Sequence, residues 1–216
     1  MLGSHPDLSF AITYFGKFQN SYNETNFKHL ENVLRYMNKT KDYCLCYLKD
    51  VIESYVDADF ANETLDRKSV SGYFFRVFGD NASWKSMKQS CVILFSTEAE
   101  YVALASAATE CLYVRNILTE SLALPKIGIV IFEGNQSYIK ICSTVETKRS
   151  KHNSVKLHFV KYLVLKTKIL RLSYVETSDQ LSDCLTKALP YCKLIKCIEG
   201  LGISKLADSV VCDNFG

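Results

Sequence analysis

The chain has 216 residues and a mass of 24.5 kDa, enough for one full hydrophobic core but hardly for two independent domains of typical size. Hydrophobic residues make up 48% and charged residues 23% of the sequence, which excludes an intrinsically disordered chain. The formal net charge of +3 permits nucleic-acid binding without requiring it.

The N-terminal region predicts two helices followed by two strands. Apolar residues recur at helical spacing in residues 8–18 and again in residues 26–37. Two β-rich runs follow at residues 43–48 and 51–56, with a charged turn at residues 49–50 between them. We therefore expect a short helical extension that leads into the first strands of a sheet.

The middle of the chain predicts a hairpin and a long helix. Residues 69–78 and 82–84 have the composition of strands, and the GDN sequence at residues 79–81 is a good turn signal between them. Residues 97–122 are rich in Ala, Leu and Glu and contain neither Gly nor Pro, so we expect one long helix that ends before Pro125.

The remainder of the chain alternates strands and helices. In chain order we expect a buried strand at residues 127–132, a helix near residues 136–141, a helix at residues 154–165 and a strand at residues 169–175. After several antiparallel strands, this alternation predicts an α/β protein with a mixed central sheet and flanking helices.

The nine cysteines are an odd number scattered along the chain, without a CxxC pair or a matching pair of histidines. We interpret them as small apolar packing residues and not as zinc ligands. The sequence also has no run of about 20 apolar residues and no N-terminal signal peptide. We expect an intracellular protein, cytoplasmic or nuclear, that does not enter a membrane.

Three carboxylates stand at or near the ends of predicted elements. Asp57 ends a strand, Glu100 lies in the first turn of the long helix, and Asp183 lies near the C-terminus. Nucleases that use two divalent ions need several converging carboxylates, because Mg²⁺ prefers oxygen ligands. Spacing alone leaves open a solvated surface charge or a helix cap for each residue, and a helix dipole would favour an anion at Glu100 in any case.

Six short motifs favour a metal site over solvated surface charges for these carboxylates. They are YVDADFA (55–61), DRKSVSGY (66–73), SWKSMKQ (83–89), STEAEY (96–101), RSKH (149–152) and LSDCLTK (181–187). In this order they resemble the ribonuclease H domain of copia-type LTR retrotransposon Pol polyproteins. Upstream, HPDL (5–8) and LRYM (34–37) resemble the end of the reverse transcriptase that precedes this domain. The resemblance covers nearly everything up to about Gly202.

The resemblance implies a ribonuclease H-like fold that cleaves the RNA strand of RNA/DNA hybrids with two Mg²⁺ or Mn²⁺ ions. Asp57 matches the first catalytic aspartate, which ligates both ions, while Glu100 matches the helix glutamate and Asp183 the last aspartate. Asp59 is expected to be structural, although a swap of roles with Asp57 stays open. No small-molecule cofactor is expected.

The resemblance also implies a division of the chain. Residues 1–50 would be a remnant of the reverse transcriptase C-terminal region, residues 51–187 the ribonuclease H-like domain, and residues 188–216 a C-terminal tail that is partly helical. We expect the first segment to lack an independent core. It should either pack on the sheet or expose apolar residues such as Phe15 and Phe27.

The third carboxylate of the family departs from the pattern. The family has an acidic residue followed by Asp-Asn-Gln after its middle strand, and this chain has Gly134 in place of that aspartate. We expect Glu133 to be a poor substitute, because successive strand residues project to opposite faces. Hybrid cleavage should then be weak or absent. A non-catalytic transposon remnant, a nucleic-acid-binding module or an interaction domain remain alternatives.

Several polar residues are candidates for nucleic-acid contacts, with a solvated surface as the equal alternative. Those for phosphates are Lys85, Lys88, Lys148, Arg149, Lys151 and His152, and those for the backbone or a 2′-hydroxyl are Ser96 and Asn135. We expect Tyr73, Phe75 and Trp84 in the sheet core or on a sheet face, and His158 as a packed residue on an apolar helix.

Overall fold

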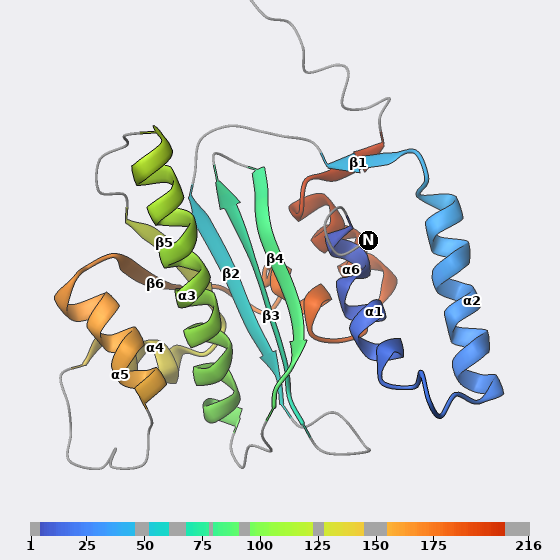
Figure 1. Ribbon diagram of the computed structural model, residues 1–216, viewed down its shortest axis with the longest axis horizontal. Helices are drawn as coiled ribbons and strands as arrows, with labels where there is room; N and C mark the ends of the chain where they lie inside the picture. Colours follow the sequence, from blue (N-terminus) through green and yellow to red (C-terminus); the bar gives the residue numbers. More distant parts are fainter. Residues whose placement is uncertain are drawn as a thin grey trace, which may run out of the picture.

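The computed structural model describes residues 5–45, 52–60, 68–77, 80–90, 96–122, 128–144 and 155–205. Five strands form a central sheet in the order β4-β3-β2-β5-β6, and helices pack on both of its faces (Figure 1). The strands are β2 (Glu53–Asp59), β3 (Val70–Val77), β4 (Asp80–Lys88), β5 (Ile129–Glu133) and β6 (Leu170–Tyr174). The predicted α/β architecture with a mixed sheet, flanking helices and a short helical N-terminal extension is confirmed.

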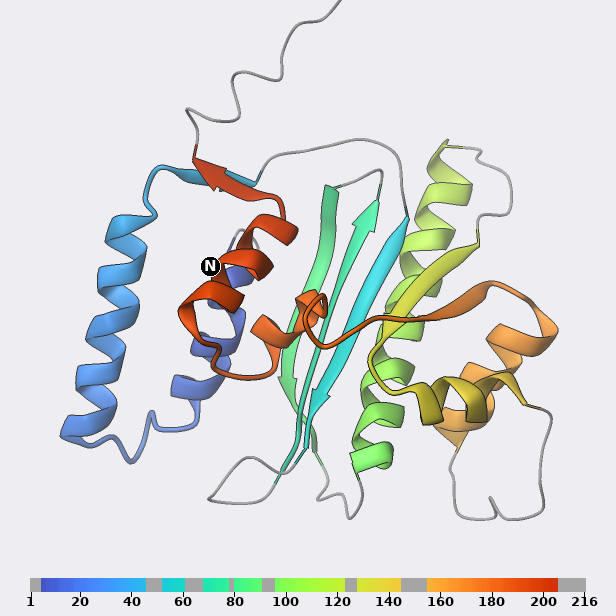
Figure 2. The ribbon, with the colours of Figure 1, turned by 180° about the vertical axis from the view of Figure 1, so that it is seen from behind.

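The helices fall into two groups on either side of this sheet (Figures 1 and 2). On one side lie α3 (Ser96–Leu122), α4 (Gln136–Ser143) and α5 (Val155–Lys161), which continues into a π-helical turn, η2 (Tyr162–Lys166). On the other side lie η1 (Pro6–Leu8), α1 (Ser9–Gly16), α2 (Glu24–Lys39), the 3₁₀ turn η3 (Leu181–Leu185) and α6 (Tyr191–Gly200). Each sheet face is therefore covered, and the candidate residues lie where elements from both layers approach one sheet end.

The pairing of the strands brings two strand ends together. β2 is antiparallel to β3 and parallel to β5, so the carboxyl ends of β2 and β5 point in the same direction. In this register Val56 lies beside Glu133, the last residue of β5, and Asp57 lies opposite Gly72 of β3. The carboxyl ends of β2 and β5 thus bring Asp57 and Glu133 to the same end of the sheet.

The β3–β4 hairpin differs from the sequence expectation. The turn was expected at residues 79–81, but Asp80 pairs with Val77 and both Asp80 and Asn81 belong to β4. Residues 78–79 lie outside the described part of the chain. β4 is also longer than the expected strand at 82–84, because pairing along β3 holds lysines and serines in a strand that their own β propensity would not favour.

The larger core lies between the sheet and α3. Small residues on one face of α3, such as Ala103 and Ala107, are fully buried and allow the helix to approach the sheet closely. Ile129 and Ile131 of β5 and Val56 of β2 face the same core. This packing fixes the start of α3, and with it Glu100, beside the ends of β2 and β5.

The N-terminal segment packs on the other face without a separate core. Thr13 of α1 donates a hydrogen bond to the backbone oxygen of Ser86 in β4, at 3.1 Å. The short strand β1 (Tyr43–Leu45) pairs with β7 (Ile203–Lys205) in a separate two-stranded sheet and does not join the central sheet. At the same time α2 leaves Phe27 58% exposed. Both expected outcomes, packing on the sheet and exposure of apolar residues, therefore occur together.

Two expectations about single residues have clear outcomes. Tyr73 and Phe75 are buried and Trp84 is half-buried against the core on the α6 side, as expected. His158 is exposed, and the expectation of a packed histidine is wrong because α5 turns Leu157 inward and His158 outward. Within the described ranges, no helix has the length and apolar character needed to cross a membrane.

Candidate functional site

A cavity of about 470 Å³ opens at the end of the sheet where β2 and β5 finish. Asp57, Glu100 and Asp183 all line it, and we call it the carboxylate cavity. They come from β2, α3 and η3, three elements far apart in the sequence. The structure therefore brings the three sequence-predicted carboxylates to one place. Gly134 lies on the wall of the same cavity.

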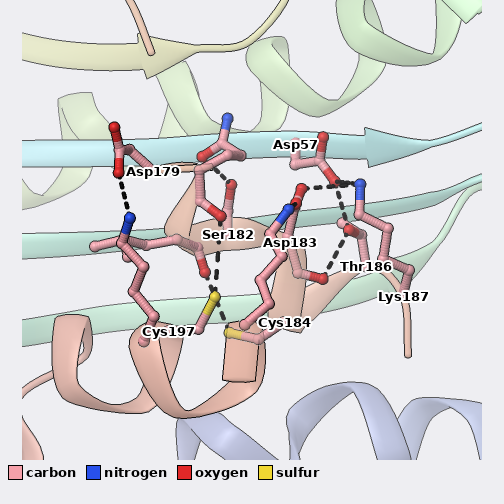
Figure 3. Close-up of polar contacts among 12 residues, drawn as sticks. Asp57, Asp179, Ser182, Asp183, Cys184, Thr186, Lys187 and Cys197 are labelled. Carbon is pink, nitrogen blue, oxygen red and sulfur yellow. Dashed lines mark hydrogen bonds and ion pairs between the residues drawn. The ribbon is translucent and has the colours of Figure 1, made fainter. Parts of the chain in front are cut away.

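Asp57 and Asp183 meet at one ammonium group, that of Lys187 (Figure 3). The Lys187 Nζ atom lies 3.3 Å from Asp57 Oδ2 and 2.8 Å from Asp183 Oδ1. Thr186 donates a further hydrogen bond to Asp57 Oδ2, at 2.5 Å. Burial raises the pKa of Asp57, Lys187 lowers it, and the nearby Asp183 carboxylate raises it. The two aspartates thus form a close pair that a cation stabilises.

Asp183 is held deep in the structure by η3. Its side chain is nearly fully buried and forms a second ion pair, with Lys193 of α6. The residue that precedes η3, Gln180, donates from Nε2 to the backbone oxygen of Val56 at 2.9 Å and accepts from Ser182 Oγ at 2.8 Å. These contacts attach η3 directly to β2, so the position of Asp183 relative to Asp57 is determined by buried hydrogen bonds.

Gly72 allows this close approach. It lies opposite Asp57 in the β2–β3 pairing. A Cβ atom at Gly72 would lie 2.7 Å from the Leu185 Cβ atom and 2.7 Å from the Thr186 Cγ2 atom, distances that side chains do not tolerate. The Gly in the SVSGY part of the second motif is therefore required for η3 to pack against β3 beside Asp57.

Glu133 lies beneath the cavity and close to Glu100. It is 1% exposed, and its Oε1 atom accepts a hydrogen bond from the Asn135 backbone N–H at 3.0 Å. Burial raises the pKa of Glu133 to about 8, and burial followed by the charge of Glu133 raises the pKa of Glu100 to about 10. The Oε2 atoms of both glutamates are buried without a hydrogen-bond partner.

The expectation that Glu133 points away from the site is therefore wrong. Glu133 is the last residue of β5 and lies on the α3 face with Ile129 and Ile131, where Glu100 also lies. The alternation of faces holds only within a strand, and Gly134 is already outside β5. Glu133 and Gly134 consequently reach the same site from below and from its wall.

Gly134, the position at which the resemblance predicts a carboxylate, has open space around it. A Cβ atom built on Gly134 would have one neighbour within 4 Å, the Gln180 Nε2 atom at 3.8 Å, which is an ordinary van der Waals distance. The backbone of Gly134 does not have a positive φ. An aspartate would therefore fit at this position without strain, and its side chain would start from the cavity wall.

The donor set has the chemistry of a site for a hard divalent ion. Carboxylate oxygens are the ligands that Mg²⁺ prefers, and the unpartnered Oε2 atom of Glu100 is an available donor. As the side chains stand, however, no group of three His, Cys, Asp or Glu in the described ranges is arranged to hold a metal ion. Figure 3 shows that the Lys187 ammonium instead lies between Asp57 and Asp183 and pairs with both.

The structure places two of the candidate nucleic-acid contacts beside the carboxylate cavity and two others on β4. Ser96 and Asn135 line the carboxylate cavity, although the Asn135 side chain already accepts a hydrogen bond from the Tyr138 N–H and caps α4. Lys85 and Lys88 lie on β4 and do not line this cavity. Lys148, Arg149, Lys151 and His152 lie outside the described residues.

Sequence reasoning missed Lys187, the cation of the site. It lies four residues after Asp183 within the LSDCLTK motif, a spacing at which a lysine and an aspartate become neighbours on a helical turn. That signal was present in the sequence. Its second partner, Asp57, is distant in the chain and could be found only from the fold.

No family model matches the chain. It is 31% identical over 206 residues to the "Retrovirus-related Pol polyprotein from transposon TNT 1-94" of Nicotiana tabacum, covering 94% of this chain and 15% of that protein. To the "Retrovirus-related Pol polyprotein from transposon RE2" of Arabidopsis thaliana it is 32% identical over 210 residues, covering 95% of this chain and 14% of that protein. The chain thus spans about one seventh of the length of these Pol relatives.

Two further matches are shorter or structural. The "Secreted RxLR effector protein 161" of Plasmopara viticola is 37% identical over 117 residues, which cover 53% of this chain and 82% of that protein. The solved structure of LC11-RNase H1, isolated from compost, aligns with a TM-score of 0.49 and 13% identity over 63% of this chain and 92% of that one. Over nearly its whole length, the sequence matches transposon polyproteins. The chain belongs to the retrovirus-related Pol polyproteins of copia-type transposons.

Proposed function

We propose that this chain is the ribonuclease H-like region of a copia-type Pol polyprotein, ancestrally cleaving the RNA strand of RNA/DNA hybrids, and that Gly134 impairs this activity. The observation that carries the proposal is the convergence of Asp57, Glu100 and Asp183 on one cavity from three separate elements. Membership of the Pol family supports the reaction and the substrate class. Within this assignment residues 51–187 form the ribonuclease H-like unit, residues 1–50 derive from the reverse transcriptase, and residues 188–216 form a C-terminal tail.

Asp57, Glu100 and Asp183 would hold the Mg²⁺ or Mn²⁺ ions, which when bound supply positive charge to the phosphate oxygens at which negative charge develops. Thr186 orients the Asp57 carboxylate through its hydrogen bond. Ser96 and Asn135, on the cavity wall, are placed to donate to the substrate backbone or a 2′-hydroxyl. Burial and the neighbouring Glu133 raise the pKa of Glu100, so a cation that binds in this cavity would displace a proton from that carboxyl.

Gly134 removes a donor from the wall of the cavity. The Asn135 side chain and Gln180 do not replace it, because each is engaged in a hydrogen bond within the protein. Loss of one metal ligand commonly costs orders of magnitude in rate, since neutralising the charge that develops in the transition state contributes strongly to catalysis. A non-catalytic nucleic-acid-binding remnant is the second candidate, favoured by Gly134 and by the engagement of both aspartates with Lys187.

The test is hydrolysis of a labelled RNA/DNA hybrid by the purified 216-residue chain in Mg²⁺ or Mn²⁺. We expect Gly134→Asp to raise the rate at least about tenfold over the native chain, because the added carboxylate has room at the cavity wall. Asp57→Asn introduced into the Gly134→Asp protein should abolish the gain. Equal rates for the native and Gly134→Asp proteins would contradict the assignment of Gly134 as the impairing residue.

A further inference from the structure

A second cavity, of about 350 Å³, lies on the other side of Lys187 from the carboxylate cavity. Its walls include Phe10, Tyr14 and Lys17 from the α1 region, Asp59 at the end of β2, Lys68 from the segment before β3, and Lys187. We call it the α1 groove. Lys187 lines both cavities, so the α1 groove and the carboxylate cavity are neighbours.

The α1 side of this groove combines aromatic rings with a cation. Phe10, Tyr14 and Lys17 are spaced four and three residues apart and therefore lie on one side of the helix. The Lys17 ammonium lies 5.3 Å from the centre of the Tyr14 ring, whose residue is 37% exposed. The helix itself is attached to β4 through Thr13. The hydrogen bond to β4 therefore holds α1, and with it this side of the groove, in place against the sheet.

The described residues give the α1 groove a positive charge. Lys17 and Lys68 line it together with one carboxylate, that of Asp59, while the charge of Lys187 is already matched by Asp57 and Asp183. Lysines beside an exposed aromatic ring suit a polyanion that also carries flat, stackable groups. A single nucleic-acid strand has both properties, whereas an acidic peptide offers the charge without regular stacking groups. The groove also leads to the carboxylate cavity, which on the proposed function receives the scissile phosphate.

We propose that the α1 groove binds the single-stranded continuation of a nucleic-acid strand that enters the carboxylate cavity, with Lys17 and Lys68 against its phosphates and Tyr14 stacked on a base. This proposal rests on the proposed function for the path of the strand. It assigns to α1, within the segment derived from the reverse transcriptase, a part in substrate binding. A blunt hybrid whose end lies at the carboxylate cavity would not reach the α1 groove.

The proposal is tested by fluorescence anisotropy in EDTA, where no metal ion or hydrolysis contributes. Four labelled probes are compared: a blunt RNA/DNA hybrid, the same hybrid with a single-stranded extension on its RNA strand, the same hybrid with the extension on its DNA strand, and the free single strand. The variants are Lys17→Ala with Lys68→Ala, and Tyr14→Ala. The control is the double variant Lys28→Ala, Lys39→Ala. It removes two exposed lysines of α2, and so the same amount of charge, at a distance from the groove. Unchanged melting temperatures establish that the variants fold.

We expect the Lys17→Ala, Lys68→Ala protein to bind the extended hybrid about tenfold more weakly, with a salt dependence shallower by about 0.7 per lysine in log-log slope. Tyr14→Ala should weaken the same probe about tenfold, and Tyr14→Phe should retain its affinity because the ring remains. Binding of the blunt hybrid should not change with any of these variants. The arm that shows the effect, an RNA or a DNA extension, identifies the strand.

Four results would overturn the proposal. One is an equal loss for blunt and extended hybrids, and another is an equal loss for the α2 control. The other two are the absence of binding to the free strand and displacement of that strand by an acidic peptide at equal charge concentration. Failure of the proposed function is a different outcome: if Gly134→Asp gains no hydrolysis while the extension still binds through Lys17, Lys68 and Tyr14, the α1 groove is a binding site without cleavage.

Discussion

The Lys187 ammonium nitrogen lies 2.8 Å from Oδ1 of Asp183, four residues earlier in the chain, and it also contacts Asp57. An internal cation therefore neutralises the two aspartates that would hold a metal ion. Binding of the metal requires displacement of this ammonium from between them. The side chain of Lys187 is 31% exposed, so its ammonium group is open to the solvent on one side.

From this arrangement we predict that Lys187→Met binds Mn²⁺ at least about tenfold more tightly than the native chain, a change of about 1.4 kcal/mol. In EDTA the same variant should be about 2 kcal/mol less stable, less than for a fully buried pair because Lys193 still contacts Asp183. Calorimetric titration and urea unfolding measure the two effects. Lys196→Met, which removes an exposed ion pair with Asp179, is the control. Unchanged Mn²⁺ affinity in Lys187→Met would refute the competition.

Gly72→Ala should separate η3 from the sheet. The new Cβ would meet Leu185 and Thr186 at 2.7 Å, and since one neighbour is a Cβ atom close to the backbone, the turn itself must move. We expect the free energy of unfolding to fall by about 1–3 kcal/mol, the usual range for overpacking. Gly16→Ala is the matched control, because no atom lies within 4 Å of a Cβ there. Urea unfolding of both variants checks this, and a neutral Gly72→Ala would contradict the packing.

Stability should depend on pH through the buried glutamates. Burial raises the pKa of Glu133 from 4.5 to about 8, so the folded chain holds a proton that the unfolded chain releases between these values. Stability is therefore full below about pH 4.5 and is lost as the pH rises towards 8, by up to about 1.4 kcal/mol per pH unit for each such group. Glu100 adds a similar loss over a range that extends to about pH 10.

In metal-free buffer, Glu133→Gln should thus be more stable than the native chain at pH 8 and should lose less stability between pH 5 and pH 8. The amide oxygen of the new Gln can still accept the Asn135 N–H. Glu120→Gln, at an exposed position of α3, controls for the loss of one surface charge. Urea midpoints measured across this range check the sign. A native chain that gains stability from pH 5 to pH 8 relative to Glu133→Gln would contradict the raised pKa of the buried carboxyl.

Much of the fold followed from local sequence pattern. The Ala-rich, Gly-free stretch at residues 97–122 became α3, and the apolar run before Glu133 became β5, because helix propensity and burial on both faces act within one segment. Pairings between distant segments did not follow. β1 pairs with β7, and β4 extends along β3, because partners supplied by the tertiary structure outweigh the preferences of the segments themselves.

In the candidate site, too, residues within motifs could be predicted from the sequence, whereas contacts between distant segments could not. Asp57, Glu100 and Asp183 were identified from motifs, and the structure places them around one cavity. Glu133 was assigned to the wrong side because the alternation of a strand was extended past its last residue. The cation of the site, Lys187, and the tether from Gln180 to Val56 depend on contacts across more than one hundred residues, which spacing along the chain does not reveal.

The three carboxylates should still attract a divalent ion, while Gly134 prevents efficient hydrolysis. A single Mn²⁺ titration tests both parts when melting temperature and hydrolysis of an RNA/DNA hybrid are followed in the same samples of the native chain. We predict that the melting temperature rises with Mn²⁺ concentration, as mass action requires, and that the rise is lost in Asp57→Asn, while hydrolysis stays near the level of that variant. Robust hydrolysis by the native chain, abolished by Asp57→Asn, would contradict the impairment that we assign to Gly134.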